Sequence, residues 1–221
     1  MWPAIAGGSR YSVDAFSREV VGLMDPPPRH ENVSNIPFDP RFLICANHYQ
    51  RKGMWILHPA SAITQAVAER LGRSDAPVRW VVTANWPKVR IGPWRAPNPG
   101  DWLLPRVAHA LHCYPVSFAG ANPAYTARSL RRLLQEARSL TAPIGLFPEG
   151  VAGTAGKIGA PLPGVGRLIQ LLARQGLPVL PVRIREEDRL VVHFGARIEA
   201  DQLAGISDAA RLVMARIADL P

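Results

Sequence analysis

Short apolar runs alternate along the chain with longer segments whose apolar residues recur at helical spacing, and this alternation limits the folds open to it. The runs are bounded by turn residues, which is typical of buried strands. Strands are predicted at 42–46, 78–83, 111–116, 144–147, 179–184 and 190–194, and helices at 60–71, 102–110, 123–137, 164–175 and 207–220. The alternation predicts an α/β fold, with a largely parallel sheet flanked by helices.

The 221 residues are predicted to form a single layered domain, 1–221, because no linker or internal repeat divides them. Residues 1–36 are expected to be an N-terminal helical arm. Val13, Phe16 and Val20 share one face of a helix that Ser12 could cap, and three prolines at 26–28 end it. This apolar face could cover the sheet or lie on a membrane.

The positive charge is concentrated in one part of the sequence. The formal net charge is +9, and the stretch from Arg41 to Gln135 contains 13 basic and 3 acidic residues. Such an excess favours an anionic partner, which could be a membrane surface, a nucleic acid or a phosphorylated substrate. Composition does not choose among the three.

Compartment is predicted from what the sequence lacks. No apolar run is long enough to span a bilayer, and the N-terminus has no basic segment followed by an apolar one, as a secretory signal would. The two cysteines, Cys45 and Cys113, lie in apolar runs and are expected to be core thiols. We therefore expect a cytoplasmic protein.

Polar residues follow two predicted strands at the ends where α/β sheets bind their ligands. The strand at 42–46 leads into Asn47 and His48, and the strand at 144–147 leads into Glu149 and a glycine-rich loop. If the two strands are neighbours, His48 and Glu149 share one crevice.

These residues resemble the ordered motifs of the glycerolipid acyltransferase superfamily, which is typified by bacterial 1-acylglycerol-3-phosphate acyltransferases. The first family motif is Asn-His followed by four residues and Asp, and the third is Phe-Pro-Glu-Gly. The chain has Asn47-His48, then Phe147-Pro148-Glu149-Gly150 at about the family's usual interval, and residues 177–182 resemble the fourth block. The resemblance covers roughly residues 37–195, and the order of the motifs makes it more specific than any one of them.

The resemblance implies an enzyme of lipid metabolism that moves a fatty acyl group from an acyl thioester to a hydroxyl of a lysophospholipid or related glycerolipid. It implies catalytic roles for His48, as general base, and for Glu149. A neutral imidazole near pH 7 has the basicity for this task. The donor would be acyl-CoA or an acyl carrier protein thioester, and no cofactor or metal is expected. Substrate-binding roles are expected for Asn47, Arg51, Lys52, Phe147, Pro148, Gly150 and Lys157.

The chain departs from the family pattern at three places. The motif Asp, which orients the imidazole, is replaced by Gly53, and Glu149 could take over that role. The second motif, at 114–118, has no Arg, and Val151-Ala152 stand where the third motif continues with Thr-Arg. Arg51, Lys52 and Lys157 are the cations that could bind a phosphate instead.

The alternative is a catalytically impaired relative that binds lipid or acyl groups at the membrane surface, in which case Gly53→Asp would test the lost acid. Nucleic-acid binding rests on charge alone and is not expected. Tryptophans 80, 86, 94 and 102 alternate with Lys88, Arg90 and Arg95, which favours a lipid interface, although Trp80 lies in a predicted strand. Peripheral association with the inner face of an anionic membrane is the resulting expectation.

Overall fold

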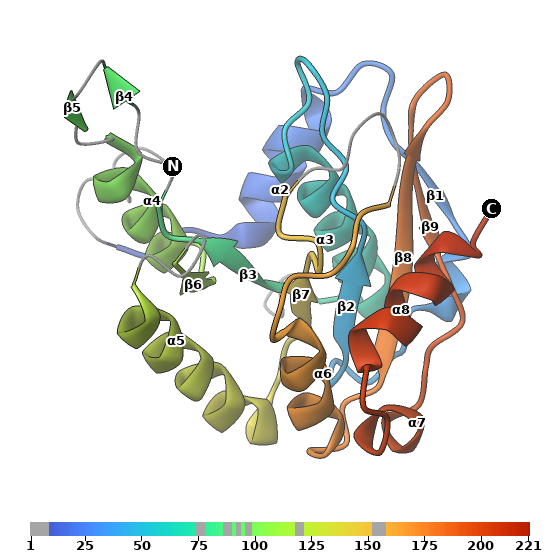
Figure 1. Ribbon diagram of the computed structural model, residues 1–221. Helices are drawn as coiled ribbons and strands as arrows, with labels where there is room; N and C mark the ends of the chain where they lie inside the picture. Colours follow the sequence, from blue (N-terminus) through green and yellow to red (C-terminus); the bar gives the residue numbers. More distant parts are fainter. Residues whose placement is uncertain are drawn as a thin grey trace.

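Seven strands form one sheet in a computed structural model that describes residues 9–73, 78–85, 90–91, 94–95, 99–117, 122–151 and 158–221 (Figure 1). Their order across the sheet is β1-β9-β8-β2-β7-β3-β6. The bounds are β1 Arg29–Glu31, β2 Leu43–Ala46, β3 Arg79–Thr83, β6 Tyr114–Val116, β7 Ile144–Leu146, β8 Val179–Glu186 and β9 Leu190–Phe194. Strands β4 (Arg90–Ile91) and β5 (Trp94–Arg95) form a separate antiparallel pair.

Most of the sheet is parallel, which confirms the predicted α/β fold class. Strands β8, β2, β7, β3 and β6 run in one direction, β9 is antiparallel to β8, and β1 is parallel to β9. The carboxyl ends of β2, β7 and β8 therefore share one edge of the sheet with the amino end of β1. We call this the site edge.

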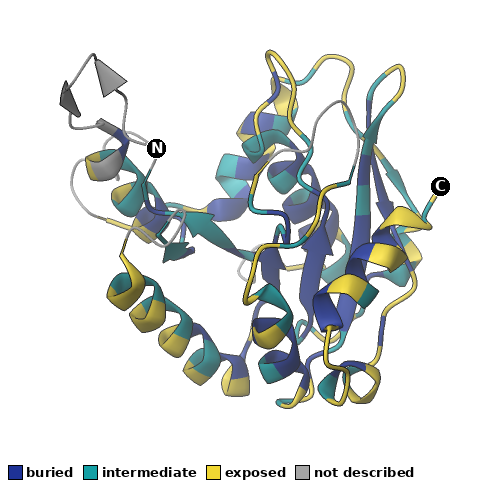
Figure 2. Cartoon of the chain, in the orientation of Figure 1, coloured by how far each residue is buried: buried dark blue, intermediate teal, exposed yellow. Residues whose placement is uncertain are grey.

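Helices cover both faces of the sheet. Apolar residues of α2, α3 and α4 pack on one face, and those of α5, α6, α7 and α8 pack on the other. The central strands are buried while the outward faces of the helices are exposed (Figure 2). Helix bounds are α2 Val13–Gly22, α3 Leu57–Leu71, α4 Pro99–Ala110, α5 Pro123–Glu136, α6 Val165–Ala173, α7 Ala200–Ala204 and α8 Ala209–Ala218, with 3-10 turns η1 Val33–Asn35 and η3 Ala137–Ser139.

Strand β2 lies between β8 and β7, and helices cover both of its faces, so its side chains on both faces are in the core. Ile44 belongs to the apolar cluster on the α2–α3 side, whereas Leu43 and Cys45 belong to the cluster on the α6–α8 side. Cys45 and Cys113 are both buried and unbonded to each other, and burial raises the pKa of the Cys113 thiol to about 12.

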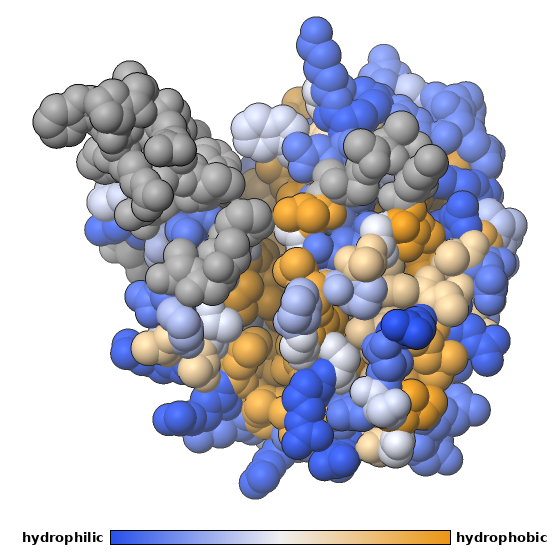
Figure 3. All heavy atoms as spheres, viewed as in Figure 1, coloured by the Kyte–Doolittle hydropathy of each residue, from blue (hydrophilic) through white to orange (hydrophobic). Residues whose placement is uncertain are grey.

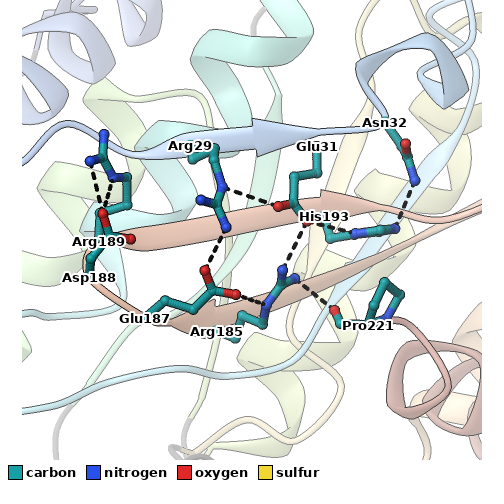
Figure 4. Close-up of polar contacts among 9 residues, drawn as sticks. All are labelled: Arg29, Glu31, Asn32, Arg185, Glu187, Asp188, Arg189, His193 and Pro221. Atoms are coloured by element: carbon teal, nitrogen blue, oxygen red, sulfur yellow. Dashed lines mark hydrogen bonds and ion pairs between the residues drawn. The ribbon is translucent and has the colours of Figure 1, made fainter.

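The predicted N-terminal helical arm is only partly helical. Helix α2 is present and the Ser12 hydroxyl accepts a hydrogen bond from the Ala15 N–H, as a cap does. The arm then continues into β1, whose polar sequence gave no strand signal. Side chains hold this edge strand, with Glu31 bonded to His193 and Arg185, and Arg29 bonded to Glu187 (Figure 4). The helix α7 was likewise not predicted.

The strand predicted at 111–116 begins three residues late because helix α4 ends across its first part. The Cys113 N–H donates to the Ala108 carbonyl, and the Leu111 N–H donates to the Val107 carbonyl. His112 adopts a φ of 54° between them, in the left-handed region that ends helices. The apolar side chains of Leu111 and Cys113 are buried in the core at the end of α4, which explains the apolar start of this run.

A glycine at the centre of β7 makes room for a tryptophan on β3. Trp80 pairs with Gly145, and a Cβ at Gly145 would lie 2.4 Å from the Trp80 indole. The Trp80 Nε1–H donates to the Thr64 hydroxyl on α3, which in turn donates to the Ala60 carbonyl. The indole therefore cannot move aside without losing a buried hydrogen bond.

We expect Gly145→Ala to lower the free energy of unfolding by about 1–3 kcal/mol, the usual cost of overpacking a core. Gly22→Ala is the matched control, because a Cβ there meets nothing within 4 Å, and it should be neutral or stabilise by up to about 1 kcal/mol. Urea denaturation of both variants measures the difference. Equal stability of the two variants would contradict the tight fit of Trp80 on Gly145.

Candidate active site

The two predicted strand ends meet at the site edge. Strands β2 and β7 are adjacent and parallel, with Leu43 beside Ile144 and Cys45 beside Leu146. The loops that carry His48 and Glu149 therefore leave neighbouring strands at the same edge, which confirms that the two residues share one region of the fold.

Asn47 fixes the end of β2 to the third strand of this group. Its side-chain N–H donates to the Ile184 carbonyl on β8 over 2.9 Å, and its side-chain oxygen accepts from the Ile184 N–H over 2.6 Å. The amide is buried and is used on both its donor and its acceptor side. Asn47 therefore fixes the start of the loop that carries His48, and its expected substrate-binding role stays a prediction.

His48 is half-buried, and the burial lowers the pKa of its imidazole, so that the ring is neutral at pH 7. Its Nδ1 atom is buried and has no hydrogen-bond partner among the residues that the structure describes. The ring meets Phe147 edge-on, with 5.6 Å between centroids and 65° between planes. His48 is thus an uncharged imidazole that packs against an aromatic ring.

Glu149 connects the loops at the site edge through backbone hydrogen bonds. Its side chain is buried, at 2% exposure; Oε1 accepts from the His48 backbone N–H over 2.7 Å, and Oε2 accepts from the Gly159 N–H. A Cβ at Gly159 would lie 2.8 Å from Oε2, so glycine is needed there. The hypothesis that Glu149 orients the imidazole therefore differs from the geometry, in which Glu149 holds the main chain of His48.

The turn after β7 has its own constraints. The Gly150 N–H donates to the Phe147 carbonyl, and the Leu162 N–H donates to the Pro148 carbonyl. Gly150 has a φ of 65°, and a Cβ there would lie 2.1 Å from Leu162 Cδ1. Pro148 and Gly150 therefore shape the loop that carries Glu149.

Arg51 is paired with a carboxylate at the site. Its guanidinium bonds to both oxygens of Glu186 on β8 at 2.5–2.7 Å, and the Tyr49 hydroxyl donates to the same carboxylate. Burial and Glu186 raise the pKa of Tyr49 to about 12. The pairing offsets the charge expected to bind phosphate, whereas Lys52 is exposed next to it.

A cavity of about 350 Å³ opens beside this ion pair. It lies between the loop after β2 and the end of β8. Its lining residues are Asn47, Tyr49, Gln50, Arg51, Ile158, Arg183, Ile184, Arg185 and Glu186. Arg183 and Arg185 are themselves bonded to backbone carbonyls of the C-terminal segment, at Leu220 and Pro221.

Gly53, at the position of the family's motif Asp, lies in a tight exposed turn. The Arg51 and Met54 backbones exchange two hydrogen bonds of 3.0 Å across it, and Gly53 has a φ of 81°. The nearest atom to a Cβ at this position is Arg51 Nη1, at 3.9 Å. A side chain at position 53 would therefore begin beside the guanidinium of Arg51.

Several predicted residues lie outside the described residues. Lys157 and Ala152 are among them, as are Trp86 and Lys88 of the basic aromatic segment, and nothing is described of the side chains of Arg90, Trp94 and Arg95. Trp102 is exposed on α4, with the Arg106 guanidinium 4.3 Å from its ring centroid. Trp80 is buried, as its place in a strand predicts.

Sequence reasoning missed the partners of the predicted residues. Ile184 and Glu186 lie far along the chain from the residues they bind, and no spacing links them to His48. Gly159 is ten residues from Glu149, but no motif marks it as a partner. The contact between Trp80 and Gly145 could have been predicted from the sequence. A large aromatic residue on one strand needs a small residue on the neighbouring strand, and Gly145 is the glycine of the strand predicted at 144–147.

No family model matches the chain, and no curated protein matches its sequence. Among solved structures, the chain is similar to the 1-acyl-sn-glycerophosphate (LPA) acyltransferase PlsC from Thermotoga maritima, with a TM-score of 0.62 and 16% identity. The match covers 93% of this chain and 75% of the Thermotoga maritima chain. The α/β sheet that carries His48 and Glu149 thus has the fold of an acyltransferase.

Proposed function

We propose that the protein is an acyltransferase, with a fatty acyl thioester as donor and a hydroxyl of a lysophospholipid or related glycerolipid as acceptor. The observation that carries the proposal is the bond between the Glu149 carboxylate and the His48 backbone N–H, which joins the two motif loops into one site. The fold shared with the Thermotoga maritima protein, which is named as an LPA acyltransferase, supports the same assignment.

His48 is the general base in this proposal. As the acceptor hydroxyl oxygen attacks the thioester carbonyl carbon, the imidazole takes the hydroxyl proton and later gives it to the departing thiolate. Because Nδ1 is buried, we assign Nε2 as the nitrogen that moves the proton. The backbone N–H groups of His48 and Gly150 are already bonded, so the donors for the oxyanion are other groups.

Exposed apolar side chains at the site edge support a lipid surface as partner. They belong to the end of α2, the loop after β2 and the loop after β7. Their exposed fractions are 86% for Leu23, 56% for Trp55, 48% for Val151 and 45% for Leu162. Aromatic and aliphatic side chains around a site, with Lys52 exposed among them, suit the interface of an anionic bilayer. None of the helices in the described ranges is both long and apolar enough to cross a membrane.

The face of the sheet that α5, α6, α7 and α8 cover supports a place for an acyl chain. Half-buried apolar residues of α5, β3 and α6 lie against the core there, namely Leu130, Leu134, Val81 and Val165. The space-filling view shows a hollow with apolar walls beside α6 (Figure 3). The impaired, lipid-binding relative remains the competing function, and the unpartnered Nδ1 of His48 favours it.

We expect His48→Ala to lower acyl transfer at least a hundredfold, because the base is lost. The measurement is thiol release from long-chain acyl-CoA and acyl carrier protein donors, with lysophosphatidate, other lysolipids or no acceptor. His109→Ala, which removes an exposed histidine on α4, is the matched control and should keep the wild-type rate. Full activity of His48→Ala would rule out this mechanism. If the wild-type protein is folded but no tested pair of donor and acceptor gives thiol release, the lipid-binding function is favoured.

Gly53→Asp is expected to leave the transfer rate within about twofold of wild type. The turn places the new Cβ near Arg51, and the positive φ is tolerated by Asp better than by most residues. Gly53→Asn, which has the same shape without the charge, is the control. A tenfold gain for Asp and not for Asn would mean that the carboxylate reaches the imidazole, contrary to the described turn.

Trp55→Ser and Leu162→Ser should each weaken binding to vesicles that contain phosphatidylglycerol about ten- to a hundredfold, because a buried apolar side chain contributes about 1.5–3 kcal/mol. Phe38→Ser is the control, since Phe38 is 69% exposed but precedes β2 at the opposite edge. Vesicle sedimentation measures the partition. An equal loss for all three variants, or for none, would contradict a lipid contact at the site edge.

A further inference from the structure

The imidazole of His48 lacks the partner that a general base usually has. In a serine hydrolase triad, a carboxylate on Nδ1 fixes the tautomer and the direction of the ring. Here Nδ1 is buried without a partner in the described part of the chain, and both oxygens of the nearby Glu149 are bonded to backbone N–H groups. Some other contact must hold the ring if it is to act as a base.

A column of aromatic rings runs from the base into the core. The His48 ring meets Phe147 edge-on, and Phe147 stacks on the Trp80 indole with 4.7 Å between centroids and 9° between planes. Edge-on and stacked contacts of this kind favour a defined ring orientation. Phe147 therefore has its position set by Trp80 on one side and presents a fixed surface to His48.

The far end of the column is anchored more firmly than its exposed end. Trp80 is buried at 5% exposure, its indole lies flat over Gly145, and its Nε1–H is bonded to Thr64. Gly145 and Phe147 are two residues apart in extended chain and therefore lie on the same face of it. The indole that packs on Gly145 thus also reaches Phe147. The column and its support thus come from the helix α3, the strands β3 and β7, and the loops after β2 and β7.

We propose that Phe147 and Trp80 are positioning residues that orient the His48 imidazole by ring packing, in place of the carboxylate on Nδ1. The catalytic meaning of this positioning rests on the proposed function of His48 as a base. The packing that orients the ring does not depend on that function. Phe147, expected from the sequence to bind substrate, is assigned here to the base. In this proposal the Phe147 ring orients the imidazole by packing against it, where a serine hydrolase triad uses a hydrogen bond from Nδ1.

The orientation can be measured without any substrate. Long-range ¹H–¹⁵N NMR spectra report the tautomer and the pKa of each histidine, and a His48→Gln variant assigns the His48 signals. In wild type we expect one neutral tautomer and a pKa below 6.5, because burial disfavours the charged ring. In Phe147→Leu we expect mixed tautomers and a pKa that rises toward the ordinary value of about 6.5 as water reaches the ring.

Phe194→Leu is the matched control. Phe194 is fully buried on β9 and contacts the His30 ring, so its loss should destabilise the fold without changing the His48 signals. Thr64→Val is a second variant, which removes only the hydroxyl that holds the Trp80 Nε1–H. It should shift the His48 signals in the same direction as Phe147→Leu, by a smaller amount, and it keeps the test decisive if Phe147→Leu does not fold.

Kinetics give an independent measure in the active enzyme. Phe147→Leu should lower kcat about ten- to a hundredfold, the cost of a misplaced catalytic group, with KM changed less than threefold. A general base must be neutral, so kcat/KM falls as the pH drops through its pKa. The higher pKa in Phe147→Leu would therefore move this acid limb to higher pH.

The outcomes separate the two proposals. Unchanged His48 tautomer and pKa in Phe147→Leu and Thr64→Val, or an equal change in Phe194→Leu, would overturn the positioning role whatever the activity. Changed signals in the two column variants, together with no acyl transfer by wild type, would uphold the ring packing and reject only the proposed acyltransferase.

Discussion

The buried carboxylate of Glu149 is the group on which the rest of the site depends. A carboxylate at 2% exposure is costly unless it is hydrogen-bonded, and here its two oxygens receive the N–H groups of His48 and Gly159. These three residues come from three separate loop segments, so satisfying one charge fixes the loop after β2, the turn after β7 and the segment before α6. The bond from the His48 N–H to Glu149 therefore sets the direction of the main chain just after β2.

The parts of the fold that were predictable are those with a local signal. Strand β2 is apolar over its whole length, and β9 is apolar except for His193. The order of strands and helices predicts which strand ends can meet. Strand β1 gave no such signal because its residues are polar. Side chains of β8, β9 and the turn between them, which are distant in sequence, hold Glu31 and Arg29. Only the start of the strand predicted at 111–116 was wrong, because the backbones of Leu111 and Cys113 bond to the end of α4 while their apolar side chains are buried.

The candidate site shows the same division between local and long-range information. The motifs identify His48 and Glu149 as candidates, whereas the adjacency of β2 and β7 was only a condition in the sequence and is supplied by the structure. Several of the polar groups bind residues more than a hundred positions away, such as Glu186 for Arg51 and Ile184 for Asn47. A sequence can indicate that a cation stands near a strand end, but its net charge at the site is decided by the carboxylate that folds against it.

Asn47 has a consequence for how the chain changes direction at the base. Its amide has the same donor and acceptor as a peptide group, and it bonds both backbone groups of Ile184, which would bond to successive backbone groups of β2 if this parallel strand continued. The hydrogen-bond ladder between β2 and β8 is therefore one unit longer than the strand itself. The main chain is released from the sheet at this point, while no buried group of β8 loses its partner. A side chain that imitates the backbone thus lets a regular sheet end in a sharp functional bend.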